Sequence, residues 1–451
     1  MVRYVPSWKP LVVTVAVLAV LAFAGRHLLF GREGLVFLPL WLTGFAWKTV
    51  PLLVSSFARP FTTTAGQDLA LDSLRVAVAV PVYNEDPVLL DRCLYALANQ
   101  SRPPDVIHVV EDGPSVNYAA LRDHWTSCPP VRGRVCWTRM PVNAGKKAAQ
   151  AVVFTSHPEA DIFVTVDSDT TLEPHALAEG LKPFADPRNM SVAGVEENFN
   201  KRVNWLTRSV AVRNTYYQLT VWGTQALFGD LLVNRGTFAL YRAWVIREIV
   251  PAYVNETFLG RPIKLGDDAA LTLFCQAKGR TVQQISAFSL PMHPETLSHH
   301  FRQWLRWARG AVIRNCWRLR YLPMWTYGFW WTVLTWYMIF MSGVVPVILV
   351  MSWPRSEHVL EFAGAAVIGW SYLVGARALA VKRADENAWQ RAGSLLLYPA
   401  GILWATAVLR PLRLYGMATF LRQRWTTRQA GVEQLALPRP LPRRELEEAI
   451  R

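Results

Sequence analysis

The sequence predicts an α/β domain with a mostly parallel, doubly wound sheet, inserted between transmembrane α-helices. Three observations lead to this prediction. Apolar runs of roughly 20 residues, the length that a helix needs to cross a bilayer, lie near both ends of the chain. The middle alternates short buried strands with helical segments, as parallel sheets do. Polar clusters follow those strands, at the edge where such sheets bind ligands.

Composition agrees with membrane segments attached to a water-soluble domain. The 451 residues are 52% hydrophobic and include 20 tryptophans, yet 18% are charged and the net charge is +15. A basic excess suits either nucleic acid or a cytoplasmic membrane surface. Many arginines sit beside apolar runs and tryptophans, at residues 302–320 and 410–428, which favours membrane lipid as the partner and argues against nucleic acid. The five cysteines have no CxxC spacing, so neither a zinc site nor a disulfide framework is expected.

Residues 1–55 are expected to form a transmembrane hairpin. Its two apolar stretches, residues 10–30 and 34–54, are joined by a short link, so both outer ends should lie on one side of the membrane.

The C-terminal region, residues 323–421, carries three further apolar runs, at residues 325–353, 358–381 and 392–409. The next stretch, residues 411–420, is a tilted span, a re-entrant hairpin or a surface helix. The basic tail, residues 422–451, predicts a cytosolic C-terminus. Three membrane spans would place the C-terminus on the outer side of the membrane, so we expect that one of these segments does not simply cross it.

The middle of the chain reads as a series of strands and helices. Asp86 and Pro87 provide the N-cap and first residue of the first helix. A second helix should follow residues 143–147 and reach about residue 154. The predicted strands cover residues 75–81, 106–110, 136–139 and 162–166.

Asp167 and Asp169 follow a buried strand and place two carboxylates on one side of an extended chain. Two hard oxygen ligands at this spacing suit Mg²⁺ or Mn²⁺ shared with a diphosphate. The alternative is a solvated turn that caps a helix at Pro174.

Asp267 and Asp268 precede an apolar helical pattern. A carboxylate at a helix start can deprotonate an acceptor hydroxyl, as sugar transfer with inversion requires. The alternative is that the aspartate simply caps the helix.

Gln303, Arg306 and Trp307 share one face of a helix predicted over residues 297–318. Arginine can bind a diphosphate with two parallel hydrogen bonds, and a tryptophan ring can stack on a sugar. The alternative is an amphipathic helix lying at the membrane interface, and both can hold.

Lys146 and Lys147 stand near a helix start, where they could pair with phosphate or be solvated charges. His293, His299 and His300 resemble metal ligands, but without a matched carboxylate pattern they are not assigned that role.

Taken in order, these motifs resemble the processive family-2 glycosyltransferases, which include hyaluronan, chitin and cellulose synthases. The likeness to hyaluronan synthases extends to the sequences of residues 166–170 and 266–268, and Trp425-Thr-Thr-Arg428 is similar to their C-terminal gating motif. The family motifs read here as Asp112-Gly113, Asp167-Ser-Asp169, Asp267-Asp268 and Gln303-x-x-Arg306-Trp307.

The resemblance implies a domain plan. Residues 56–295 would be a cytosolic GT-A catalytic domain and residues 296–322 an interfacial helix that carries Gln-x-x-Arg-Trp. Residues 323–421 would form a channel for the polymer, followed by the tail with its gating motif. The protein would sit in the cell membrane as a multi-pass enzyme.

The resemblance also implies a role for each motif. The donor would be a UDP-sugar and the acceptor a growing polysaccharide. Asp268 would be the general base, supported by Asp267. The other residues would divide four roles. Tyr83, Glu85, Asp112 and Lys146 would bind the uridine, and Asp167 and Asp169 would bind the diphosphate and its metal. Arg306 would bind the diphosphate, Gln303 and Trp307 would bind the acceptor, and Trp425 would close over the donor.

The chain departs from hyaluronan synthases near the acceptor, which puts hyaluronan itself in question. Hyaluronan synthases typically have Cys-Ser-Gly-Pro before a Tyr-Arg pair, whereas this chain has Asn234-Arg235-Gly236-Thr237 before Tyr241-Arg242. In addition, Glu111 stands where Asp is usual, and Thr426 follows Trp425 in place of Gly. Two other functions stay open: transfer of a single sugar to a lipid or polyprenyl phosphate, and a membrane scaffold with an inactive transferase domain.

Overall fold

The computed structural model describes residues 1–5, 50–113, 116–127, 134–352, 368–373 and 375–423. Its centre is an eight-stranded sheet with strand order β4-β3-β2-β5-β8-β7-β11-β6. The predicted strands and the helix capped by Asp86 are confirmed within a few residues. The strands are β2 (Val76–Val82), β3 (Val106–Glu111), β4 (Arg134–Arg139), β5 (Ile162–Thr165), β6 (Thr171–Leu172), β7 (Asn189–Glu196), β8 (Ala239–Arg242) and β11 (Arg280–Leu290).

The sheet is mixed, which corrects the prediction of a mostly parallel one. Strands β4, β3, β2 and β5 are parallel, as are β7 and β11. Strand β8 is antiparallel to both β5 and β7, and β6 is antiparallel to β11. The sequence prediction covered the parallel strands β2, β3, β4 and β5, and it did not include β6, β7, β8 or β11.

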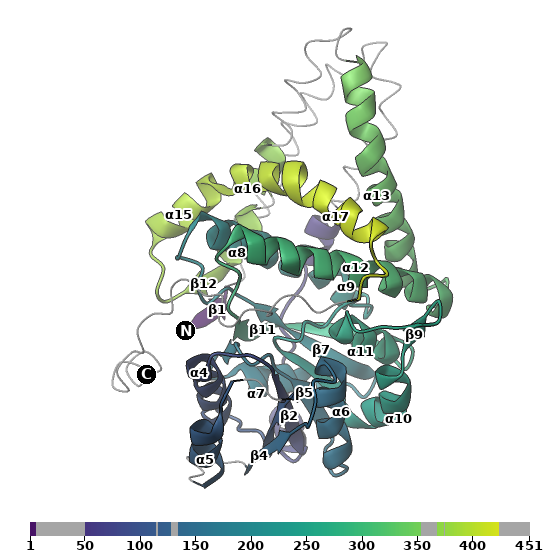
Figure 1. The fold of residues 1–451 in the computed structure, drawn as a ribbon. Coiled ribbons are helices and arrows are strands. Elements are labelled where there is room, and N and C mark those ends of the chain that lie inside the picture. Colours follow the sequence, from purple (N-terminus) through teal and green to yellow (C-terminus); the bar gives the residue numbers. More distant parts are fainter. Residues whose placement is uncertain (6–49, 114–115, 128–133, 353–367, 374, 424–451) are drawn as a thin grey trace.

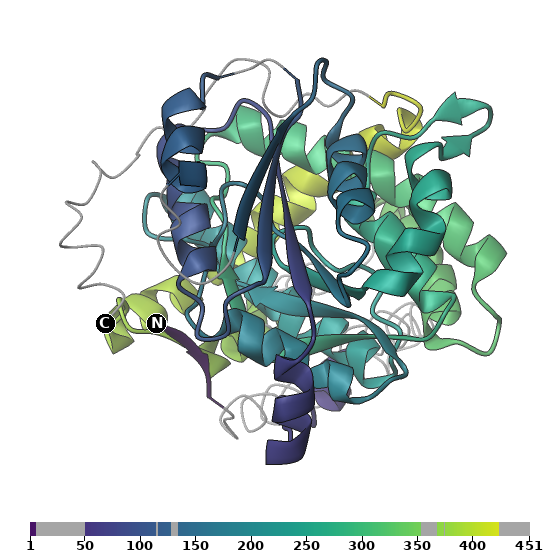
Figure 2. The ribbon, with the colours of Figure 1, turned by 90° about the horizontal axis from the view of Figure 1, so that it is seen from below.

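Helices cover both faces of the sheet (Figure 2). The even-numbered valines of β2 pack against α4 and α5, while Ala77 and Ala79 face α6 and α10. Strand β2 is therefore buried on both sides, as its continuous apolar run predicts. The helices of this domain are α3 (Ala65–Asp72), α4 (Pro87–Ala98), α5 (Ala119–Ser127), α6 (Lys146–Ser156), α7 (Ala176–Leu181), α8 (Trp205–Tyr217), α9 (Gly223–Leu227), α10 (Ala243–Val254) and α11 (Asp267–Gln276).

A layer of helices lies over one end of the sheet (Figure 1). Helix α12 (Leu297–Tyr321) runs along this layer, and α13 (Tyr327–Ser352) points away from the domain. Helices α15 (Ala388–Leu396), α16 (Tyr398–Trp404) and α17 (Arg410–Ala418) follow one another across α12, with a π-helical turn at residues 405–409.

The stretch at residues 411–420 is a helix packed against α12. Trp304 Nε1 donates a hydrogen bond to the Leu409 carbonyl (2.9 Å), and Arg309 Nε donates to Thr419 Oγ1 (3.2 Å). By length and composition, a single helix in the described part of the chain, Ala388–Ala418, could cross a membrane. The N-terminal hairpin at residues 10–54 falls largely outside the described residues, as Trp425 does entirely. Of the run at residues 358–381, the structure describes residues 368–373 and 375–381.

The N-terminus is held against the catalytic domain. Strand β1 (Val2–Tyr4) pairs antiparallel with β12 (Val381–Arg383), and these strands pack against β11. The start of the chain therefore packs against β11 of the central sheet.

Candidate active site

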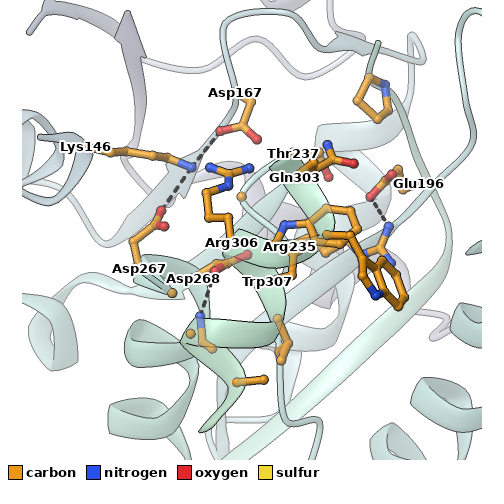
Figure 3. A pocket seen from close by; sticks show the side chains of 18 of the residues that line it. Lys146, Asp167, Glu196, Arg235, Thr237, Asp267, Asp268, Gln303, Arg306 and Trp307 are labelled. Atoms are coloured by element: carbon orange, nitrogen blue, oxygen red, sulfur yellow. Dashed lines mark hydrogen bonds and ion pairs between the residues drawn. The ribbon is translucent and has the colours of Figure 1, made fainter. Parts of the chain in front are cut away.

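A cavity of about 960 Å³ opens between the carboxyl ends of β2, β3, β5 and β7 and the inner face of α12. Every predicted site residue within the described part of the chain lines it, and Figure 3 shows most of the charged ones pointing into it. These residues are Tyr83, Glu85, Asp112, Lys146, Asp167, Asp169, Asp267, Asp268, Gln303, Arg306 and Trp307. The topology thus brings together predicted site residues that are up to 224 positions apart, as Tyr83 and Trp307 are (307 − 83).

Asp112 fixes the loop that leads into α6. Its carboxylate accepts hydrogen bonds from the backbone N–H groups of Ala144 (2.7 Å) and Gly145 (2.9 Å). Burial raises the pKa of Asp112, although these two N–H groups lower it. The interaction sets the position of Lys146, the first residue of the helix.

Glu85 is buried and tied to the Asp-Ser-Asp turn. Ser168 Oγ donates a hydrogen bond to Glu85 Oε2 (2.7 Å), and the Tyr118 hydroxyl accepts one from the Glu85 N–H (2.7 Å). These bonds make Glu85 a link between the ends of β2 and β5.

Lys146 bridges two of the predicted motifs. Its ammonium lies 2.7 Å from Asp167 Oδ1 and 3.0 Å from Asp267 Oδ2. Burial alone would lower the pKa of Lys146, but the carboxylates of Asp167 and Asp267 raise it, so the lysine stays charged. The same cation lowers the pKa of Asp267, against the effect of burial.

Asp268 lines the cavity one residue further on. Burial raises its pKa to about 6, and the neighbouring charge of Asp267 adds to this effect. The two adjacent carboxylates therefore have opposite pKa shifts, which is typical of acid–base sites.

The N-cap of α11 is Gly266 and not an aspartate, and its φ of +74° lies in the left-handed region. Asp268 Oδ1 does accept a hydrogen bond from the Ala269 N–H in the first turn (3.0 Å). The alternative role of the Asp167–Asp169 turn, capping a helix at Pro174, is wrong, because α7 begins at Ala176 after the short strand β6. Both carboxylate pairs are thus left facing the cavity.

Asp167 and Asp169 fit a divalent cation that shares its ligands with a diphosphate. Both are partly accessible from the cavity, and Lys146 is hydrogen-bonded to one oxygen of Asp167. Among the described residues, no group of three His, Cys, Asp or Glu side chains could hold a metal on its own. One or two carboxylates plus phosphate oxygens are a common set for Mg²⁺.

Helix α12 forms the opposite wall of the cavity. Gln303, Arg306 and Trp307 project from it towards the aspartates (Figure 3). The charge of Arg306 also lowers the pKa of Asp267. Trp307 is 38% exposed and its ring lies 6.1 Å from that of Trp304, so an aromatic surface is open to a ligand.

A buried cluster that the motifs did not predict as a site lies beside this wall. Arg235 Nη1 is 2.5 Å from Glu196 Oε2, and His293 Nε2 is 2.5 Å from Glu196 Oε1. Burial would raise the pKa of Glu196, but Arg235 and His293 lower it to about 2. The Arg235 guanidinium also lies 4.6 Å from the centre of the Trp222 ring. The sequence feature that could have indicated this cluster is the position of Glu196 at the end of a buried strand.

Glu111, where the chain departs from hyaluronan synthases, and Arg242, of the Tyr241-Arg242 pair, do not line the cavity. Glu111 accepts a hydrogen bond from Trp137 Nε1 (2.5 Å) and pairs with Arg139 (3.0 Å). Arg242 donates to the backbone carbonyl of Phe184 (2.8 Å), next to the buried Tyr241.

Comparisons with known proteins place the chain among sugar-transferring enzymes. Residues 162–381 match the family model described as Glycosyl transferase family group 2. The chain is 31% identical to a hyaluronan synthase of Streptococcus pyogenes over 79% of this chain and 83% of that protein. It is 28% identical to an N-acetylglucosaminyltransferase of Sinorhizobium fredii over 82% of this chain and 89% of that protein.

Among solved structures, the chain is similar to a mannosyltransferase from Pyrobaculum calidifontis in complex with GDP-Man and Mn²⁺. That similarity has a TM-score of 0.46 at 18% identity and covers 85% of this chain and 97% of that one.

Proposed function

Because this chain belongs to the family-2 glycosyltransferases, we propose that it is a membrane-embedded, inverting enzyme that polymerises sugars from UDP-sugar donors and moves the polymer across the membrane. The product would be hyaluronan or a related polysaccharide that contains N-acetylglucosamine, as the names of its relatives suggest. The enzyme's class as a sugar transferase follows from its family.

The observation that carries the proposal is the single cavity shared by three sets of residues. Asp112 and Lys146 lie on the domain side, Asp268 near the middle, and Trp307 on the α12 side. A donor and an acceptor sugar can therefore meet at one carboxylate.

In this mechanism the acceptor hydroxyl attacks C1 of the donor sugar from the face opposite the diphosphate. A bond forms between the acceptor oxygen and C1, and the bond from C1 to the diphosphate oxygen breaks. Asp268 takes the hydroxyl proton, and UDP leaves with the bonding electron pair. Asp267 holds Lys146 beside the diphosphate, and Arg306 and Lys146 offset its negative charge.

A divalent cation, Mg²⁺ or Mn²⁺, would be held by Asp167 and Asp169, and when bound it would stabilise the charge of the UDP leaving group. Tyr83, Glu85 and Asp112 would contact the uridine. Gln303 and Trp307 would hold the acceptor sugar, with the ring stacked on the indole.

The cavity also supports an exit route towards the C-terminal helices. Its lining continues to Trp331 and Thr335 of α13 and to Arg413 of α17. Gln423, the last described residue before the tail, also lines the cavity and accepts a hydrogen bond from the Leu265 N–H (3.3 Å). These contacts favour a channel in residues 323–421 and a tail, with Trp425, that closes over the donor.

The proposal is tested with purified protein in detergent or lipid, a divalent cation and a panel of radiolabelled UDP-sugars. Labelled product of high molecular weight is expected from one or two donors. Label in a lipid extract alone would instead establish the alternative, transfer of a single sugar to a lipid or polyprenyl phosphate. UDP release without labelled product would contradict both.

A further inference from the structure

Glu256 is a buried carboxylate that lies outside the cavity and outside every motif in the sequence. It stands between α10 and β9 (Thr257–Phe258), and its side chain is 11% exposed. Its two partners come from different helices, Lys147 of α6 and Arg314 of α12.

Both oxygens of Glu256 are used. Oε1 pairs with Arg314 Nη1, and Oε2 lies 2.6 Å from Arg314 Nη2 and 2.7 Å from Lys147 Nζ. The side chains of Arg314 and Lys147 are 2% and 8% exposed. Burial would raise the pKa of Glu256, but Arg314 and Lys147 lower it, so the carboxylate is ionised.

Arg314 connects this ion cluster to the start of α11. Its Nε donates to the Gly266 carbonyl (3.1 Å), and Nη2 donates to the Leu265 carbonyl (3.4 Å). Gly266 is the N-cap of α11, and the next two residues are Asp267 and Asp268. The orientation of the Arg314 guanidinium therefore sets the position of the carboxylate pair.

Lys147 connects the same cluster to the donor side. It directly follows Lys146, whose ammonium contacts Asp167 and Asp267. Glu256 is thus bonded to the helix that carries the donor lysine and to the helix that carries Gln303, Arg306 and Trp307. Through Lys147 and Arg314, this one carboxylate connects α6, α12 and the start of α11.

We infer that Glu256 is a positioning residue for the transfer reaction: it holds Arg314 against the Gly266 turn and so places Asp268 for proton abstraction, without touching either sugar. The inference rests on the proposed function. Of Glu256, Lys147 and Arg314, only Arg314 lines the cavity, so Glu256 acts through its partners.

The test compares kcat and KM for the UDP-sugar in Glu256→Gln and in a control, Glu386→Gln. Glu386 is also buried and ion-paired, with Lys201 at 3.1 Å, but neither of these residues lines the cavity. Since sub-ångström misplacement of catalytic groups lowers rates steeply, we expect kcat of Glu256→Gln to fall by roughly 10- to 100-fold. Its KM should stay within about threefold, and the control should keep both constants within about threefold.

A kcat near that of the unmodified enzyme in Glu256→Gln would overturn the inference. So would an equal loss of kcat in Glu386→Gln, or a rise in KM without a change in kcat. If Glu256→Gln does not yield folded protein, Glu256→Asp is used in its place. This variant keeps the negative charge between the two cations but has a shorter side chain, and the same fall in kcat is expected. Absence of any sugar transfer by the unmodified enzyme would refute the proposed function instead.

Discussion

Lys146 and Asp267 lie 3.0 Å apart although 121 positions separate them in the sequence (267 − 146), and the same ammonium also contacts Asp167. This cation links the donor side of the cavity to the carboxylate pair of α11. It keeps Asp267 ionised while the pKa of its neighbour Asp268 is raised. The site thus separates the roles of two adjacent carboxylates.

Asp268→Asn should lower sugar transfer by roughly 10²- to 10⁴-fold, the usual contribution of a general base. Binding of the UDP-sugar, measured by calorimetry, should stay within about threefold, because Asp267 and Lys146 keep their contact. The control is Asp123→Asn, an exposed aspartate of α5. Loss of donor binding with normal transfer chemistry would contradict the role of Asp268.

The pH dependence follows from the raised pKa of Asp268, about 6. A base acts in its ionised form, so kcat/KM should rise with pH through this value and level off above pH 7. Below it Asp268 is protonated and cannot accept the hydroxyl proton. The profile is measured between pH 5 and 8 with the folded fraction checked at each pH. A profile that is already level at pH 5, as an ordinary aspartate pKa near 3.8 would give, would contradict the assignment.

Gly236→Ala should disturb the donor side without altering any charge. A Cβ at this position would lie 2.7 Å from Lys146 Nζ and 3.4 Å from Asp167 Oδ1. The lysine must move, so we expect KM for the donor to rise on the order of 10-fold.

The matched control for this change is Gly66→Ala in α3, where an added Cβ meets nothing within 4 Å. It should leave KM unchanged and stabilise the helix by up to about 1 kcal/mol. Equal KM values for the two variants would show that Lys146 does not contact the donor.

Removal of divalent cations with a chelator should abolish transfer, and Mg²⁺ or Mn²⁺ should restore it. Asp169→Asn would remove one of the two proposed protein ligands, so the half-saturating metal concentration should rise by about 10-fold or more. The concentration dependence is read from initial rates. Full activity in the presence of chelator would contradict the metal assignment.

The sequence was sufficient to predict the strands that carry the donor motifs, because a continuous apolar run followed by polar residues marks a buried parallel strand. The antiparallel strand β8 escaped prediction because its four residues carry no such pattern. Its position between β5 and β7 depends on long-range pairing, which makes the sheet mixed.

The cavity residues that belong to the sequence motifs could be predicted, because several motifs supported one another. The cluster of Glu196, Arg235 and His293 could not be predicted in this way. Its members come from three segments that are distant in sequence, and the position of Glu196 at the end of β7 is the one local feature that indicates any of them. His293 stood out only as a metal ligand candidate, whereas its Nε2 lies against Glu196. Glu256 could not be predicted as a site residue either, because its partners, Lys147 of α6 and Arg314 of α12, are distant from it in the sequence.

The most direct test of the central claim is the size of the labelled polysaccharide at low conversion of the UDP-sugar. A processive enzyme makes long chains from the start, so we predict high-molecular-weight product when only a small fraction of donor is consumed, and none with Asp268→Asn. Short chains that lengthen together over time, or product found only in the lipid extract, would contradict processive polymerisation.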